Sequence, residues 1–345
     1  MTIKDSRISG GAVRITVSLG VALGISLLFS ATPVNAADFT MKMGVVSAED
    51  AETNYLGLVK TAVEAGSKGR IEGRIFTRGQ LGSQSASIQG LQLGTIEAFI
   101  TPADFYAGID PRMGVLSFPF LFKDRAHANR VLADPVIAEK ISTMLDSKGI
   151  IGCGQVATAD VRYMLRTPLR TVADFNGKKL RINGTDAERE RFRRLGATSV
   201  PMNLADMITA LQNGTIDGSG SGITIWVNFN LDAINKELLQ IEDTLIISYC
   251  AMSKKWLDTL PADLREMVIK ESRAQFKRGV EVSDQFMASL TKKWEDRNAK
   301  TNKLSAAEQA EVRTKLADVG KIVTEGKPAL RAFYDEVKAA SDRIK

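Results

Sequence analysis

The sequence has 345 residues, of which 44% are hydrophobic and 25% are charged, and its formal net charge is +6. This mild charge and an aromatic share of 6% argue against the basic, aromatic-rich surfaces that bind nucleic acids. One histidine and two cysteines cannot form the usual zinc ligand sets. We therefore expect no nucleic-acid partner, no metal site and no cofactor.

The first 36 residues have the features of a secretory signal peptide. Lys4, Arg7 and Arg14 precede an apolar run over residues 15–31, and small residues before Ala37 suit cleavage after Ala36. An uncleaved membrane anchor is the alternative, but the run is short and is interrupted by glycine and serine. We expect export to the periplasm, with cleavage near Ala36.

From residue 39 to about residue 235, short β-prone runs alternate with helical ones, which is typical of an α/β architecture. The expected strands are 41–46, 71–76, 98–101, 150–156, 179–183 and 199–202. The expected helices are 54–65, 85–93, 125–132, 136–148, 186–195 and 204–212.

One short pattern occurs twice in this region. Residues 91–97 read LQLGTIE, and residues 211–217 read LQNGTID. Each copy ends an apolar-periodic run at a glycine typical of helix C-termini, and a β-prone segment follows. Two such units facing each other would place the segments after Glu97 and Asp217 at one cleft. The repeat and the chain length predict two lobes, although two ordinary turns could match by coincidence.

The last hundred residues are helical in pattern. Pro261 opens a run of charged and apolar residues at helical spacing that reaches Lys300, with Gly279 as its one internal glycine. This run predicts one very long helix or two joined helices. A final helical block over 305–345 has a break marked by Gly320, Gly326 and Pro328.

Three features have more than one interpretation. Cys153 and Cys250 lie in apolar β-like runs, and they could form a disulfide after export or remain two small buried residues. His127 falls on the expected helix 125–132 among polar neighbours, so we expect an exposed side chain. Residues 218–222 read GSGSG, which suggests either a turn whose serines or amides contact an anion or hydroxyl group, or simply a flexible turn. Its spacing fits neither the dinucleotide fingerprint nor the G-x-S-x-G nucleophile motif.

Two arginines are candidates for binding an anion. Arg181 lies on the expected strand 179–183, where alternation directs its side chain away from those of Leu180 and Ile182. A guanidinium group on an interior strand needs an anionic partner and matches a carboxylate bidentately. Arg162 lies in a similar β-prone context. Each arginine could instead pair with a carboxylate of the protein itself.

Several segments together resemble the solute-binding proteins of tripartite ATP-independent periplasmic (TRAP) transporters. They are GQLGS at 79–83, FPFLF at 118–122, VADFNGKKLRI at 172–182, and LGA at 195–197 followed by Pro201 and Met202. The resemblance covers essentially all of the mature chain. It implies a periplasmic-binding-protein-like α/β fold, with two lobes joined by hinge strands and a long bridging helix.

The resemblance also implies a function and a site. It implies capture of a small carboxylate-bearing organic acid between the lobes and its delivery to integral-membrane transporter subunits, without enzymatic activity. The family's carboxylate-binding arginine falls on Arg181, and a second, less uniform arginine falls on Arg162. Family members commonly read DGQENP where residues 217–222 read DGSGSG, so Ser221 replaces an asparagine that helps to hold the carboxylate. The other residues expected to line the cleft are Ser219, Trp226, Thr101 and Phe118, with core packing as the alternative for Trp226.

We expect lobe I to contain residues 37–159 with about 249–287, and lobe II to contain 160–248 with about 288–345, including the C-terminal helices. Two other functions fit the same architecture. One is a ligand-sensing partner of a membrane receptor, and the other is a periplasmic enzyme acting on an organic acid. The absence of a nucleophile motif argues against the enzyme.

Overall fold

Helices and strands alternate along residues 37–345, the part of the chain that the computed structural model describes. The predicted signal peptide lies outside the described residues. Among the described helices, none is both long and apolar enough to cross a membrane. The strands are β1 (Phe39–Gly44), β2 (Ile71–Phe76), β3 (Ala98–Pro102), β4 (Ile150–Asp160), β5 (Arg162–Leu165), β6 (Lys179–Ile182), β7 (Thr198–Pro201), β8 (Gly218–Ser221), β9 (Glu237–Gln240), β10 (Leu245–Ser253) and β11 (Lys300–Lys303).

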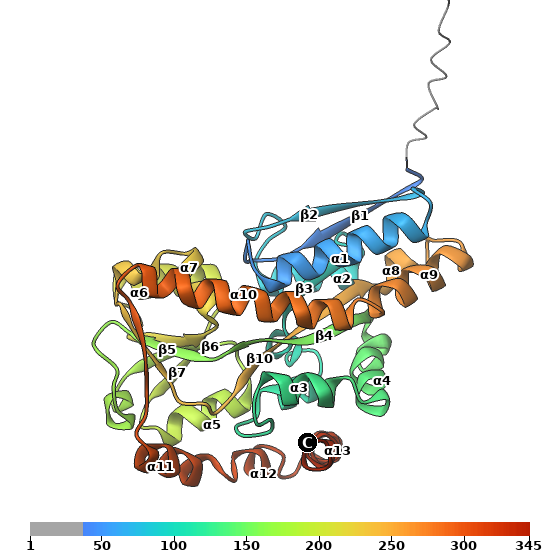
Figure 1. Cartoon of the computed structure of the whole chain (residues 1–345). Coiled ribbons are helices and arrows are strands. Elements are labelled where there is room, and N and C mark those ends of the chain that lie inside the picture. The colour runs from blue at the N-terminus through green and yellow to red at the C-terminus, as the bar shows by residue number, and fades with distance from the viewer. Residues whose placement is uncertain (1–36) are drawn as a thin grey trace, which may run out of the picture. The chain divides into compact units, whose positions relative to one another are not determined.

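The helices cover both faces of two sheets (Figure 1). They are α1 (Ala51–Gly66), α2 (Gln84–Leu93), α3 (Arg125–Leu132), α4 (Pro135–Thr143), α5 (Asp186–Arg194), α6 (Leu204–Asn213), α7 (Ile223–Asn228), α8 (Lys254–Leu257), α9 (Ala262–Arg273), α10 (Phe276–Asp296), α11 (Ala306–Leu316), α12 (Val319–Val323) and α13 (Pro328–Arg343). The region that reads as one long helix or two is two, α9 and α10.

The two sheets share one arrangement. The first has the order β2-β1-β3-β10-β4, and the second has the order β7-β6-β8-β5-β9-β11. In the first sheet, β1 pairs in parallel with β2 and β3, and β10 is antiparallel to β3. In the second, β6 pairs in parallel with β7 and β8, and β5 is antiparallel to β8. The unit β1-α1-β2-α2-β3 is therefore built again as β6-α5-β7-α6-β8.

The sequence repeat lies at the same place in both units, as predicted. Gly94 ends α2 and Gly214 ends α6, with positive φ values of 76° and 75° that glycine adopts without strain. The acid that follows then bonds twice to a lysine on the neighbouring strand. Glu97 N–H donates to Lys42 O while its carboxylate accepts from Lys42 N–H, and Asp217 forms the same pair with Lys179. Each repeat therefore fixes the start of a parallel strand.

Two strand connections and one helix join the sheets, which gives the two-lobed fold. One residue separates the end of β4 from the start of β5 in the other sheet, and the chain returns from β9 to β10. Helix α10 runs along both lobes (Figure 1), contacting α1 and β4 at one end and α7 at the other. The predicted hinge strands and bridging helix are thus both present.

The C-terminal helices also contact both halves of the chain. Helices α11 and α12 pack on α5, whereas α13 packs on α3 and α4, elements within residues 37–159. The expected lobe boundaries assign α13 to lobe II, whereas α13 packs on helices assigned to lobe I. The boundaries stay a prediction.

His127 is buried, so its predicted exposure is wrong. Its Nδ1 accepts a hydrogen bond from Lys123 N–H at 3.1 Å, and its Nε2 lies 3.0 Å from Ser341 O and 2.9 Å from Ile344 O. An N–H at Nε2 can donate to both carbonyl oxygens. The polar neighbours of His127 suggested exposure. They could not reveal its burial, because α13, which covers this side of α3, lies more than 200 positions further along the chain.

The GSGSG segment is not a flexible turn, because residues 218–221 form the strand β8 between β5 and β6. The glycines allow a close approach to β5. A Cβ on Gly218 would lie 2.3 Å from Met164 O, and one on Gly220 would lie 2.7 Å from the ring of Tyr163. Gly222 then caps α7.

A disulfide joins Cys153 of β4 to Cys250 of β10, which resolves the two interpretations of the cysteines. The two strands are neighbours, and the Cα atoms of the two cysteines are 5.1 Å apart. Around the bridge, the core of the first lobe includes Met41, Met43 and Val59. Both bridged strands lead into connections between the lobes.

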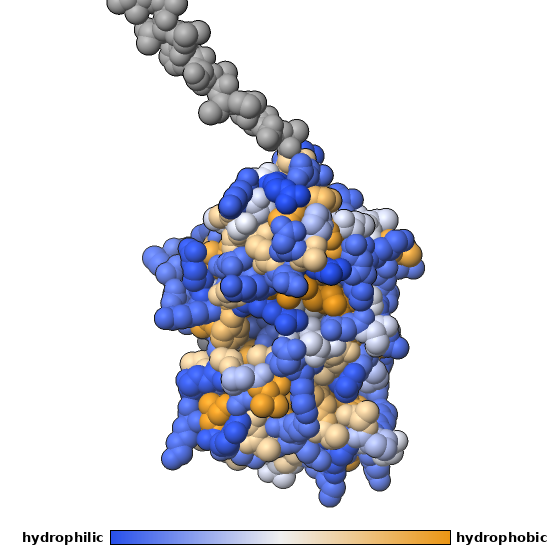
Figure 2. All heavy atoms as spheres, turned by 90° about the vertical axis from the view of Figure 1, so that its right-hand side faces the viewer, coloured by the Kyte–Doolittle hydropathy of each residue, from blue (hydrophilic) through white to orange (hydrophobic). Residues whose placement is uncertain are grey.

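The surface is mixed in polarity. On the face shown in Figure 2, hydrophilic residues surround small groups of apolar ones. Leu93, Val136 and Ile322 are the most exposed large apolar side chains among the described residues. These three residues belong to three different helices, α2, α4 and α12, and are not neighbours in the sequence.

Candidate functional site: the cavity between the lobes

A cavity lies between the two sheets, with about 850 Å³ of space free of protein atoms, including the part open to solvent. One wall comes from the first repeat unit and the segment after it, and the other comes from the second. Hinge residues such as Thr158 and Thr244 lie between the two walls. As predicted, segments that follow Glu97 and Asp217 line this cavity, here represented by Phe105 and Ser221.

Arg181 is the main cation of the second wall. It lies on β6 with 4% of its surface exposed, and its Nε donates to Met202 O at 2.9 Å. Its guanidinium carbon lies 5.6 Å from the ring centre of Phe105, on the opposite wall. Burial lowers the pKa of Arg181 to about 10, against the opposing charges of Glu188 and Asp104. The group therefore stays cationic near neutral pH, available to an anion in the cavity.

Glu188 holds the loop that follows β6. Its carboxylate accepts hydrogen bonds from the backbone N–H groups of Asn183, Gly184 and Thr185 at 3.1, 2.9 and 3.0 Å. Thr185 Oγ1 accepts from Glu188 N–H in return, which completes a capping box at the start of α5. These bonds fix the backbone next to Arg181.

Asp104 extends from the first wall toward the same place. Asn183 Nδ2 donates to Asp104 Oδ2 at 3.1 Å, which connects the two walls. Burial and the charge of Glu188 raise the pKa of Asp104 to about 7. A carboxyl with this pKa can act as hydrogen-bond donor or acceptor near neutral pH.

A second acidic group lies at the N-terminus of α1. Asp50 is the N-cap, and its carboxylate accepts from Thr53 N–H at 2.9 Å. Glu52, in the first turn of α1, accepts from Ser248 Oγ at 2.6 Å and from Ser47 Oγ at 3.4 Å. Burial, followed by the charge of Asp50, raises the pKa of Glu52 to about 8. Asp50, Glu52 and Ser47 all line the cavity.

A buried ion pair supports the floor of the cavity. Arg191 Nη1 lies 3.4 Å from Asp243 Oδ2, and both side chains are at most 5% exposed. Tyr163 Oη donates to the same carboxylate, and the guanidinium of Arg191 lies 4.9 Å from the ring centre of Phe192. Arg191 therefore already has an anionic partner within the protein.

The walls are also joined by two hydrogen bonds between the repeat helices α2 and α6. Leu204 N–H, at the start of α6, donates to Gln84 Oε1 of α2 at 3.2 Å. Ser85 N–H of α2 donates to the side chain of Asn203, the N-cap of α6, at 3.3 Å. Each helix therefore supplies a side chain that satisfies a free N–H group at the start of the other. We call this arrangement the cross-cap.

The seven residues expected to bind ligand do not all reach the cavity. Arg181 and Ser221 line it. Thr101 is buried in β3, and the Phe118 ring lies 5.3 Å from that of Tyr334 of α13. Ser219 is buried in β8, where its Oγ donates to Gly220 O.

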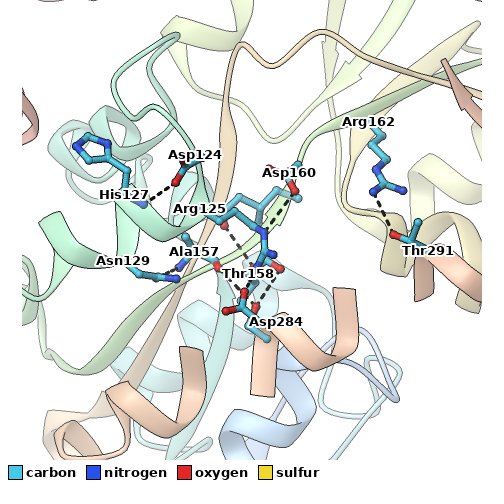
Figure 3. A network of polar contacts seen from close by, with 12 residues as sticks. Asp124, Arg125, His127, Asn129, Ala157, Thr158, Asp160, Arg162, Asp284 and Thr291 are labelled. Carbon is cyan, nitrogen blue, oxygen red and sulfur yellow. Dashed lines mark hydrogen bonds and ion pairs between the residues drawn. The ribbon is translucent and has the colours of Figure 1, made fainter. Parts of the chain in front are cut away.

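Arg162 and Trp226 lie together behind the cavity wall. The Arg162 guanidinium points at α10, where Nη2 donates to Thr291 Oγ1 at 3.2 Å (Figure 3). Trp226 is fully buried, and its indole N–H donates to Arg162 O at 3.2 Å. This geometry matches the alternative of core packing for Trp226, and it gives Arg162 a place in the contact between β5 and α10.

The sequence prediction omitted the acidic residues of the cavity, which are Asp50, Glu52, Asp104 and Glu188. A signal for three of them was present, since Asp50, Glu52 and Glu188 lie at helix N-termini that follow parallel strands. Ligands of open α/β sheets bind at that edge. The expected first helix began at residue 54, three residues after the observed start at Ala51, so it did not place Asp50 and Glu52 there.

A cleft between two α/β lobes, with a buried guanidinium group and hinge strands, defines a two-lobed solute-binding protein. The model of the family "bacterial extracellular solute-binding protein, family 7" matches residues 43–325. The chain belongs to this family, the solute-binding proteins of TRAP transporters, which are not enzymes.

Individual relatives agree with this assignment. The 2,3-diketo-L-gulonate-binding periplasmic protein of Escherichia coli is 27% identical over 222 residues, which are 63% of this chain and 67% of that protein. The sugar acid binding protein of Advenella mimigardefordensis, solved with galactonate, superposes with a TM-score of 0.80 at 23% identity, covering 87% of this chain and 98% of that one. A TRAP periplasmic solute-binding protein of Haemophilus influenzae, solved with L-gulonate, gives a TM-score of 0.82 at 20% identity, covering 88% and 99%.

Proposed function

We propose that this protein captures a small organic acid between its lobes in the periplasm, with Arg181 binding the ligand carboxylate. The observation that supports this most is the state of Arg181. Arg181 is 4% exposed and lines the cavity, and among the described residues it forms no salt bridge within 4 Å. A buried cation without a protein anion at contact distance is suited to an anionic ligand.

Closure of the lobes strengthens such an interaction. Hydrogen bonds across the cleft, such as that between Asn183 and Asp104, bring the walls together around the guanidinium. Closure excludes water, and the lower local dielectric strengthens the attraction between Arg181 and a carboxylate. Ser221, on the same wall, can supply a hydroxyl to the ligand.

Delivery is the second part of the proposal. Family members work with integral-membrane TRAP subunits, and we propose that the closed, loaded form of this chain delivers its acid to such subunits. The named relatives bind diketogulonate, galactonate and gulonate. Sugar acids are therefore the first compounds to test, followed by simple carboxylates.

The test is thermal unfolding of the wild type, Arg181→Ala and Arg181→Lys with a panel of sugar acids and simple carboxylates. A ligand at about 100 times its Kd should stabilise the wild type by about 2.7 kcal/mol. We expect Arg181→Ala to abolish this shift, and Arg181→Lys to reduce it because lysine lacks the bidentate fork.

Arg193→Ala is the matched control, since Arg193 is exposed and, among the described residues, forms an ion pair only with Glu190 of the same helix. It should keep the full ligand shift. A shift of undiminished size in Arg181→Ala would show that Arg181 does not bind the acid.

A further inference from the structure

The end of the cavity at the N-terminus of α1 offers carboxyl and hydroxyl groups. Glu52 is 8% exposed and accepts hydrogen bonds from Ser248 and Ser47, while Ser248 Oγ lies 2.8 Å from Thr158 Oγ1. Hydroxyls from β4, β10 and the loop before α1 therefore position one carboxyl group. Asp50, the N-cap of α1, lies beside it.

The cations of the cavity are elsewhere. Among the described residues, its lining contains two cationic side chains, Arg181 and Arg191. Arg191 is paired with Asp243, and burial, followed by the charge of Asp50, raises the pKa of Glu52. The cavity thus has one end at Arg181, with Asp104 and Glu188 beside it, and a second, purely acidic end at Glu52 and Asp50.

These two ends require different groups on a ligand. Arg181 and Glu52 line the same cavity, so a ligand whose carboxylate binds Arg181 can place its other end at Glu52. A hydroxyl there can donate to the Glu52 carboxyl and accept from a neighbouring serine. Burial and the charge of Asp50 raise the pKa of Glu52 because this end disfavours negative charge, and a second carboxylate bound there would meet the same cost without a cation to offset it.

We propose that Glu52 is a specificity-determining residue that selects acids with one carboxylate and a hydroxyl group at the far end, and that rejects dicarboxylates. The inference rests on the proposed function, because it takes Arg181 as the anchor of the first carboxylate.

Pairs of aldonates and aldarates test this directly. D-galactonate and D-galactarate have the same carbon skeleton and differ only at the sixth carbon, which is a CH₂OH group in one and a carboxylate in the other. D-gluconate and D-glucarate form a second pair. Calorimetric titration of the wild type should show at least one aldonate binding about 100-fold more tightly than its aldarate.

At pH 9, above the Glu52 pKa of about 8, Glu52→Gln removes a negative charge and keeps the size of the side chain. We expect it to reduce the preference at least about tenfold, mainly through tighter aldarate binding. Glu49→Gln is the matched control. It makes the same substitution three residues away, and the Glu49 side chain is exposed. It should keep the wild-type preference.

Three outcomes would overturn the inference: no aldonate binding by the wild type, equal binding of aldonate and aldarate, or a preference that Glu52→Gln leaves unchanged. The proposed function is judged separately. It survives any of these outcomes if some acid of the broader panel binds in an Arg181-dependent manner, and it fails if no acid binds at all.

Discussion

Single buried carboxyl groups determine much of the chemistry of this cavity. Glu52 and Asp104 are both buried, and both have pKa values raised to near or above neutral pH, mainly by the loss of solvation. Their protonation therefore changes within the range in which periplasmic proteins work. The raised pKa that lets these carboxyl groups donate or accept a hydrogen bond also makes the stability of the folded protein depend on pH.

The pH dependence of unfolding should report on Glu52. Its pKa is about 8 when folded and about 4.5 for the free group, so the folded state holds a proton between these values that the unfolded state has released. The contribution of Glu52 to stability is thus fully present below about pH 4.5 and is lost as pH rises toward 8.

Urea unfolding at pH 5 and pH 8 checks this prediction without ligand. Glu52→Gln should be more stable relative to the wild type at pH 8 than at pH 5, by up to a few kcal/mol. Glu49→Gln should differ from the wild type equally at both values. An identical pH dependence in the wild type and Glu52→Gln would contradict the assignment of the raised pKa.

At the scale of elements, the two repeat helices interact where they begin. In the cross-cap, the side chain of Gln84 satisfies an N–H group of α6, and that of Asn203 satisfies one of α2. These bonds exist only when the lobes are together, so they stabilise the closed form alone. Repetition of one unit in both lobes is what makes two equivalent helix ends available at the cleft.

Gln84→Ala should shift the protein toward the open form. One lost hydrogen bond of about 1 kcal/mol reduces the ratio of closed to open molecules several-fold. Pulsed EPR distances between spin labels on the two lobes, recorded at saturating ligand, measure this ratio independently of affinity. Gln92→Ala is the control, because Gln92 lies on the same helix and bonds to Lys148 O within its own lobe. Unchanged closure in Gln84→Ala would exclude the cross-cap as a latch.

The sequence predicted the ranges of individual helices and strands better than the tertiary contacts that these elements make. Helix α3 and strand β2 match their expected ranges, because periodicity and caps act within a few residues. Strand β8 was read as a turn, since four glycine and serine residues form a strand only when β5 and β6 bind both edges. Arg181 and Ser221 line the cavity, while Arg162 contacts α10 and Trp226 bonds to Arg162, contacts that the local pattern does not encode.

At the scale of the whole molecule, the connections between the lobes are the critical region. The Cys153–Cys250 disulfide links the two connecting strands, β4 and β10, within the first sheet. The pairing of these strands continues from the bridge to Asp160 and Leu245, so the first lobe is held together up to the connections.

Replacing both cysteines by serine should destabilise the protein by about 2–5 kcal/mol, as is usual for a native disulfide that closes a long loop. Chemical unfolding of the double variant measures this loss. The wild type under reducing conditions is the control and should unfold at the same denaturant concentration as the variant. Equal stability of the variant and the oxidised wild type would contradict the prediction.

The same bridge makes the second lobe part of a covalent ring. The two cysteines are 97 positions apart, and the segment between them contains β5 to β9, including the strand of Arg181. A protease that cuts once inside this ring leaves both pieces in one molecule until the disulfide is reduced. A nicked protein can therefore retain the lobe that carries Arg181, a useful property for a protein exposed to extracytoplasmic proteases.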